Sequence, residues 1–184
     1  NILYVTDLRQ NLHFNQVFRA CNKAKITENV TLEHLGYGTV NGLDGKPFKT
    51  RSGDTVKLND LFEQVKEVFI NSKESNKDMN DKDLDIIVNA IIKFADLQNN
   101  REKDYIFDIQ KFSNVVGKTG PYILYTYVRM NKILEQENLN ISSLNNTIYN
   151  KFDRDLRLKL LDLPNIIDNA YKERMPHHIA EYVY

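Results

Sequence analysis

The glycine-rich segment at residues 34–58 restricts the fold of this chain most, and it reads HLGYGTVNGLDGKPFKTRSGDTVKL. Its five glycines separate two short β-prone pieces, and the loop between these pieces carries Lys46, Lys49, Thr50 and Arg51. Glycine accepts positive φ and has no Cβ, so its backbone can approach a ligand closely. Three cations and a hydroxyl on such a loop suit a polyphosphate, whose charge they would neutralise during a reaction. A basic, solvated hairpin would have the same composition, and the segment alone leaves both interpretations open.

Length and composition limit the classes of protein to which the chain can belong. A length of 184 residues fits one large domain or two small ones. No apolar run approaches the roughly 20 residues needed to span a membrane, and the first residues lack a signal-peptide pattern. The single Cys21 excludes an internal disulfide and fits a reducing cytoplasm, and we expect it to be a small buried apolar side chain. The net charge is zero, so any RNA contact must rest on local patches.

The N-terminal residues predict half of a β–α–β unit. Residues 2–6 form a continuous apolar run that is typical of a strand buried in a parallel sheet. A polar turn follows, and residues 14–25 have helical spacing with an apolar inner face. Ligands of such sheets bind beyond the carboxyl ends of the strands, where Gln10 and His13 stand. Ordinary capping of the turn is the other interpretation of these two residues.

The order of residues in the glycine-rich segment resembles that of the corresponding segment in arginyl-tRNA synthetases. The resemblance rests on GTV at 38–40, DGKPFKTRSG at 44–53 and TVKL at 55–58. In that family this segment stands where other class I synthetases carry the KMSKS loop. A second block, TGPY at 119–122 followed by Tyr125 and YVR at 127–129, resembles the start of the family's anticodon-binding domain. The resemblance extends over nearly the whole chain, from Tyr4 to Tyr184.

The resemblance implies an activity and two groups of substrate-binding residues. ATP and L-arginine would form arginyl-adenylate and pyrophosphate, and the arginyl group would then be transferred to tRNA(Arg). Gln10 would lie in the arginine pocket with His13 close to it. His34, Gly36 and Gly38 would lie beside the adenine of ATP, with the backbone making most of the contacts. A histidine at the start of a strand is also commonly a packed, hydrogen-bonded residue.

For the basic loop, the resemblance implies a role in adenylate formation. Lys49 and Arg51, with Lys46 nearby, would stabilise charge that develops on the β- and γ-phosphates. Thr50 would bind a phosphate oxygen or hold the loop in its closed form. Lys49 and Arg51 are both candidates for the position of the second KMSKS lysine. Mg²⁺ would accompany ATP, and we expect no metal site built from protein side chains.

The remainder of the chain is helical by pattern. We expect Asn59 to cap a helix that packs on the catalytic sheet, and Asn80 to cap a second helix over residues 82–97. Residues 105–109 form a short β-like run. Pro121 should begin a helix that extends to about residue 137, Pro164 should restart the chain, and Pro176 should begin the last helix.

One face of the helix after Pro121 is a candidate tRNA contact. Tyr125, Arg129 and Lys132 recur there at spacings near one turn, and an aromatic ring among cations can stack on or pair with RNA. An ordinary solvated or inter-domain face would look the same.

The resulting fold class is α/β, the C-terminal half of a Rossmann-like class I catalytic domain, followed by an all-α bundle. We expect residues 1–115 to belong to the first part and residues 116–184 to a partial anticodon-binding domain. The family's HIGH-type motif is missing from the chain, so we expect a fragment that does not activate arginine alone. The alternative is a non-catalytic tRNA-binding or regulatory module derived from a synthetase. Either protein would be cytoplasmic, without membrane contact.

Overall fold

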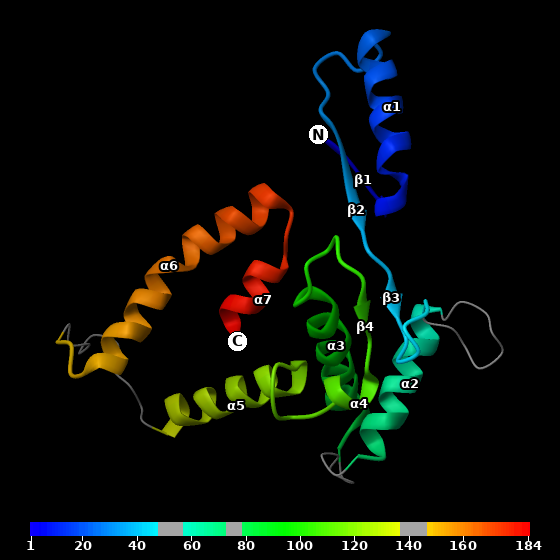
Figure 1. The fold of residues 1–184 in the computed structure, drawn as a ribbon. Helices are drawn as coiled ribbons and strands as arrows, with labels where there is room; N and C mark the ends of the chain where they lie inside the picture. Colours follow the sequence, from blue (N-terminus) through cyan, green and yellow to red (C-terminus); the bar gives the residue numbers. More distant parts are fainter. Residues whose placement is uncertain (48–56, 73–78, 137–146) are drawn as a thin grey trace. The chain divides into compact units, whose positions relative to one another are not determined.

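The structure, a computed structural model, describes residues 1–47, 57–72, 79–136 and 147–184 (Figure 1). The elements follow in the order β1 (Ile2–Asp7), η1 (Leu8–Gln10), α1 (Asn11–Lys23), β2 (Leu32–Tyr37), β3 (Val40–Asn41), α2 (Leu58–Ile70), α3 (Asp81–Leu97), β4 (Tyr105–Ile106), α4 (Ile109–Phe112), α5 (Gly120–Gln136), α6 (Lys151–Glu173) and α7 (His177–Val183). Contacts divide the chain into a strand unit, Asn1–Val56 with Asn99–Asp108, and a helical unit, Lys57–Gln98 with Ile109–Tyr184.

In the strand unit, β1 and β2 pair in parallel, with Tyr4 opposite His34 and Asp7 opposite Tyr37. Helix α1 packs on one face of this pair (Figure 1). The ring of Tyr4 lies 5.3 Å from that of Phe14 and 5.2 Å from that of Phe18, both on α1. The predicted strand, turn and helix are therefore confirmed, with α1 starting three residues earlier than expected.

The prediction that this first strand is buried is wrong. Leu3 and Val5 point away from the Tyr4 face, and Val5 is 59% exposed. Among the described residues β1 pairs with β2 alone, so a single helix covers the pair on one side only. Cys21 is half-buried rather than buried, because α1 buries only Phe18 fully.

A second parallel pair joins distant parts of the strand unit. Val40 of β3 lies opposite Tyr105 of β4, and Asn41 lies opposite Ile106. The expected strand at 105–109 is shorter than predicted because Ile109 already begins α4. Residues 99–108 thus return to the strand unit after the two helices α2 and α3.

The core of the helical unit lies where α2 and α5 pack on α3. Its fully buried side chains are Phe69, Ile91, Val65 and Val88. The apolar stripe of α2 was expected to pack on the catalytic sheet, and it packs on α3 instead, since both helices belong to the same compact unit.

One of the two helix caps expected from the sequence is confirmed. The Oδ1 atom of Asn80 accepts a hydrogen bond from the Asp83 N–H at 2.9 Å, as the sequence predicted. The Thr119 hydroxyl likewise accepts from the Tyr122 N–H at 3.3 Å at the start of α5. Asn59 is not a cap, because α2 begins one residue earlier, at Leu58.

Pro164 does not restart the chain: it lies inside α6, which continues from Lys151 to Glu173. A proline in a helix interior costs about 3 kcal/mol because it lacks the N–H donor. Helical sequence on both sides, and a cap in which Asn150 accepts from the Asp153 N–H, keep the helix continuous. The helix ends at Arg174, whose φ of 57° is left-handed. Pro176 precedes α7, as predicted.

Candidate functional site

A cavity of about 500 Å³ lies in the strand unit where β1 and β2 end. The last residues of both strands, Asp7 and Tyr37, contribute to its wall. The described lining also includes Arg9, Gly38, Thr39, Glu102 and Asp104. In open parallel sheets, ligands bind beyond the carboxyl ends of the strands, and the volume lies in the range of small-molecule sites. This strand-end cavity is therefore the candidate site.

Asp7 and Arg9 form an ion pair on one side of the strand-end cavity. The Asp7 carboxylate accepts from the Arg9 Nε at 2.9 Å and from its Nη2 at 2.6 Å, and it also accepts from the Arg9 backbone N–H at 2.8 Å. The side-chain and backbone hydrogen bonds from Arg9 lower the pKa of Asp7 to about 2. Asp7 is therefore ionised at neutral pH, and its charge is balanced by Arg9.

The other side of the cavity is held by residues that come from 99–108. Asp104 Oδ1 accepts from the Thr39 backbone N–H at 2.6 Å, and the Gly38 N–H donates to the Arg101 carbonyl at 2.9 Å. The Arg101 guanidinium also donates to the Gly36 carbonyl. The backbone hydrogen bond from Thr39 lowers the pKa of Asp104. The connection between β2 and β3 is thus hydrogen-bonded along its length.

Gly36 and Gly38 make close approaches to the protein itself. A Cβ on Gly38 would lie 2.5 Å from the carbonyl carbon and oxygen of Lys103, and one on Gly36 would lie 2.9 Å from Leu8 Cα. Both distances are shorter than real Cβ contacts, so these positions need glycine. Of the two glycines, Gly38 lines the cavity. Their expected contact with ATP stays a prediction.

Gln10 and His13 stand where expected, just past the end of β1. Gln10 ends η1, is exposed, and makes no side-chain hydrogen bond to the start of α1, so it does not cap that helix. His13 is exposed, with its ring edge-on to Phe14 at 5.5 Å. Neither belongs to the described lining of the strand-end cavity. The structure therefore does not bring Gln10 and His13 together with the residues around Asp104. Their predicted contact with arginine stays a prediction.

His34 is held by protein partners. Its Nε2 lies 2.8 Å from the Thr6 hydroxyl, and its Nδ1 lies 3.4 Å from Asn11 Oδ1. The ring stacks on Phe14 with 4.8 Å between centroids. This is the packed, hydrogen-bonded arrangement that the sequence left open. Because the side chain is held by protein partners, His34 would contact ATP through its backbone.

The predicted phosphate-binding loop is described only at its start. Lys46 is exposed in a turn where its N–H donates to Asp44 Oδ1 at 3.1 Å and its carbonyl accepts from Gly42 at 2.8 Å. Gly45 adopts a φ of 71° in this turn. Lys49, Thr50 and Arg51 lie outside the described residues, so their predicted roles stay predictions.

The predicted tRNA face lies on α5. Tyr125, Arg129 and Lys132 are all exposed, and the Arg129 guanidinium carbon lies 5.7 Å from the centroid of the Tyr125 ring. The structure brings the first two together as a cation–π pair.

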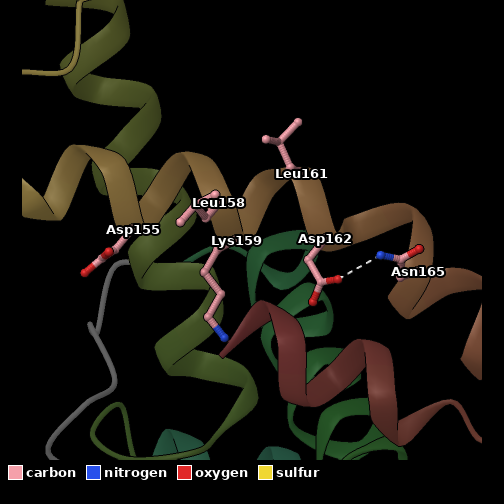
Figure 2. Close-up of a pocket in the computed structure, with 6 residues that line it drawn as sticks. All are labelled: Asp155, Leu158, Lys159, Leu161, Asp162 and Asn165. Atoms are coloured by element: carbon pink, nitrogen blue, oxygen red, sulfur yellow. Dashed lines mark hydrogen bonds between the residues drawn. The ribbon is translucent and has the colours of Figure 1, made fainter.

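A second hollow, of about 620 Å³, follows α6 (Figure 2). All of its described lining residues come from that one helix, which makes it a surface furrow. The Asn165 amide donates to the Asp162 carboxylate at 3.1 Å, and Leu161 points away from these polar groups. Its polar groups do not converge on a shared point, so we do not treat it as the functional site.

Sequence reasoning missed most of the cavity wall. Asp7 and Arg9 follow a predicted strand directly, and the same strand-end rule that selected Gln10 would have found them. Thr39, Glu102 and Asp104 had no such signal, because the structure joins segments that 65 positions separate. Among the described residues, no group of three or more His, Cys, Asp or Glu side chains is placed to hold a metal ion, and no helix is long and apolar enough to cross a membrane.

Comparison with known proteins decides the family. Residues 1–109 match the family model for the catalytic domain of class I tRNA synthetases (R). Residues 123–184 match the DALR anticodon binding domain. The chain belongs to the class I arginyl-tRNA synthetase family. The resemblance and the predicted fold class, a class I catalytic part followed by a helical domain, are confirmed.

Similar proteins agree with this assignment. The arginine–tRNA ligase of Francisella tularensis subsp. tularensis (strain WY96-3418) is 44% identical over 192 residues, which cover 100% of this chain and 33% of that protein. The arginine–tRNA ligase of Alkaliphilus oremlandii is 41% identical, with 100% and 32% covered. The chain spans about a third of the length of these curated relatives.

Solved structures show the same fold. The arginyl-tRNA synthetase of Plasmodium falciparum superposes with a TM-score of 0.75 at 27% identity, over 98% of this chain and 32% of that one. The Thermus thermophilus arginyl-tRNA synthetase gives a TM-score of 0.75 at 25% identity, over 98% of this chain and 30% of that one.

Proposed function

We propose that this chain takes part in the ATP-dependent ligation of L-arginine to tRNA(Arg) through an arginyl-adenylate. The observation that supports this most is the order of the two family matches, a class I catalytic domain followed by a DALR domain. In this proposal residues 1–115 are the C-terminal part of the catalytic domain, and residues 116–184 are part of the anticodon-binding domain.

The strand-end cavity suits the part of ATP that carries no phosphate. In its described lining, the carboxylates of Asp7, Glu102 and Asp104 stand beside the guanidinium of Arg9. Carboxylates repel phosphate groups and accept hydrogen bonds from hydroxyl and amino groups. We therefore place the adenosine at this cavity and the triphosphate toward the basic loop.

The basic loop would supply the charge that the cavity lacks. Lys46 and the two alternatives for the second KMSKS lysine, Lys49 and Arg51, would meet the β- and γ-phosphates as pyrophosphate leaves. Thr50 would donate to a phosphate oxygen or hold the loop closed. In this arrangement the phosphates lie away from the carboxylates of Asp7 and Asp104.

Mg²⁺ would accompany the triphosphate of ATP and would not bind at the strand-end cavity. The Asp7 carboxylate is already bound by Arg9, and Asp104 Oδ1 is bound by Thr39. Mg²⁺ in nucleotide sites is held by one or two carboxylates together with phosphates and waters, so a protein cage is not required. When bound, the ion would neutralise part of the phosphate charge, and the cations of the basic loop would neutralise the remainder.

The helical unit would contact tRNA through Tyr125, Arg129 and Lys132 of α5. The exposed ring of Tyr125 can stack on a base, and the two cations can meet phosphates. We also propose a cytoplasmic location, because the single Cys21 fits a reducing compartment.

A chimaera tests the proposed function. This chain would replace the matching third of the Francisella tularensis arginine–tRNA ligase, and the control would lack that third altogether. We expect the chimaera to catalyse arginine-dependent exchange of pyrophosphate into ATP and the control to be inactive. A folded chimaera that binds tRNA(Arg) without exchange activity would favour the alternative, a non-catalytic RNA-binding module.

A further inference from the structure

We propose that Asp104 is a positioning residue for ATP: its carboxylate holds the backbone of Thr39 and so sets the wall of the strand-end cavity. This inference rests on the proposed function, because it takes ATP as the occupant of that cavity. Asp104 would act through Thr39 and Gly38 rather than by chemistry of its own.

The first step is the pattern of hydrogen bonds. Five of the hydrogen bonds between residues 36–41 and residues 101–107 each cross more than sixty positions of the chain. Four of these bonds involve backbone atoms of the later segment or the Arg101 guanidinium: Gly38 N–H to the Arg101 carbonyl, Arg101 to the Gly36 carbonyl, Tyr105 N–H to the Thr39 carbonyl, and Phe107 N–H to the Asn41 carbonyl. The fifth is the 2.6 Å bond from the Thr39 N–H to Asp104 Oδ1.

The second step is the place of the fifth bond. The strand pairing of β3 with β4 begins at Val40, so it does not itself fix the Thr39 N–H. Gly38, Thr39 and Asp104 all line the cavity. The Asp104 carboxylate therefore fixes the backbone at the point where it leaves the strand pairing and faces the cavity. A carboxylate accepting from a backbone N–H makes a stronger bond than a neutral acceptor does.

The third step is the electrostatic setting. Asp104 interacts with the charges of Asp7 and Arg9 across the same cavity, and the Thr39 hydrogen bonds hold its pKa below the ordinary value. The carboxylate is therefore charged whenever ATP is bound near neutral pH. Loss of this acceptor would leave the Thr39 N–H pointing at the carbon stub of a shorter side chain, and the connection from Gly36 to Thr39 would move.

The test uses the Francisella chimaera and compares three substitutions. Asp104→Ala removes the acceptor, and we expect the KM for ATP in pyrophosphate exchange to rise about tenfold with the KM for arginine changed less than twofold. Asp104→Asn keeps an oxygen that can accept from Thr39, and we expect it to restore the KM to within about threefold of the starting value. Glu28→Ala removes an equal charge from an exposed turn of the same unit, outside the described lining of the cavity, and its effect should stay below about threefold.

Amide hydrogen exchange gives a second readout that does not depend on turnover. The Thr39 amide should exchange at least about tenfold faster in Asp104→Ala than in the starting protein or in Asp104→Asn. An unchanged KM for ATP in Asp104→Ala would overturn the inference, and so would equal effects of Asp104→Ala and Glu28→Ala. A chimaera with no exchange activity before any substitution would instead overturn the proposed function.

Discussion

The backbone of Gly120 at the start of α5 lies directly against the main chain of Ala90 in α3. A Cβ added at residue 120 would fall far inside contact distance of the Ala90 carbonyl oxygen and carbon. The atoms it would meet are backbone atoms, which a change of side-chain rotamer does not remove. This close approach belongs to the packing of α5 on α3, which is one part of the core of the helical unit.

Gly120→Ala should therefore destabilise the helical unit. Overpacking of this kind typically costs about 1–3 kcal/mol, which outweighs the gain of about 1 kcal/mol in helix propensity from glycine to alanine. Urea unfolding followed by circular dichroism measures the difference. The control, Glu135→Ala on an exposed turn of α5, should stay within about 0.5 kcal/mol. Equal stabilities for Gly120→Ala and the starting protein would contradict the contact with Ala90.

The ion pair of Asp7 with Arg9 predicts a pH dependence. Because hydrogen bonds from Arg9 lower the pKa of Asp7 from 3.8 to about 2, its contribution to stability is fully present above about pH 4 and is lost as pH falls toward 2. Arg9→Gln should raise the pKa of Asp7 toward its ordinary value and flatten stability over this interval. Carboxyl NMR of Asp7 measures the change, and an Asp7 pKa that stays near 2 in the variant would refute the assigned cause.

His177 predicts a second dependence, at milder pH. Its Nδ1 is buried without a hydrogen-bond partner among the described residues, and its ring lies 4.4 Å from that of His178. Burial, and next the neighbouring His178, lower its pKa below 6.5, while Glu173 and Glu181 oppose the shift and Lys118 adds to it. Unfolding thus binds a proton, so this stability is present above about pH 6.5 and falls as pH drops through the folded pKa.

The measurement for His177 is urea unfolding at pH 7.5 and at pH 5. His177→Gln should reduce the difference in unfolding free energy between the two pH values, since it removes the titrating group. His13→Gln, at an exposed histidine, should leave that difference as it is in the starting protein. If both variants behave alike, His177 is not the group responsible.

The exposed face of α5 predicts a salt-dependent loss of RNA affinity. Arg129→Ala and Lys132→Ala should each weaken tRNA(Arg) binding and reduce the slope of log K against log salt by about 0.7–0.9, since each would remove one of the proposed phosphate contacts. Binding at several salt concentrations measures the slope. Lys93→Ala removes an equal charge from an exposed position on α3 and serves as the control. Identical slopes in all three variants would mean that this face does not contact the RNA.

The basic loop predicts a split between rate and affinity. In the chimaera, Lys49→Ala or Arg51→Ala should lower kcat for pyrophosphate exchange by about 100-fold with little change in the KM for arginine. The variant with the larger fall identifies the residue that replaces the second KMSKS lysine. Lys57→Ala, beyond the loop, is the matched control. Effects confined to the KM for ATP in both variants would make these residues ground-state contacts.

Local interactions made much of the fold predictable. The Asn80 cap joins residues three positions apart, and the strand, turn and helix from Ile2 to Lys23 follow from hydrophobic period and turn chemistry alone. Local rules also failed where packing and continuity override them. Pro164 stays within α6, and β1 remains exposed although its residues are apolar.

By itself, the sequence determined the family and the strand, turn and helix at the N-terminus, because both rest on ordered short motifs and on nearby residues. Only the tertiary structure decided the wall of the strand-end cavity. Thr39 and Asp104 are 65 positions apart, with two helices of the other unit between them, and no periodicity or motif links them. Their contact depends on where the chain returns after α3, which the packing of whole elements sets rather than any residue's own preference.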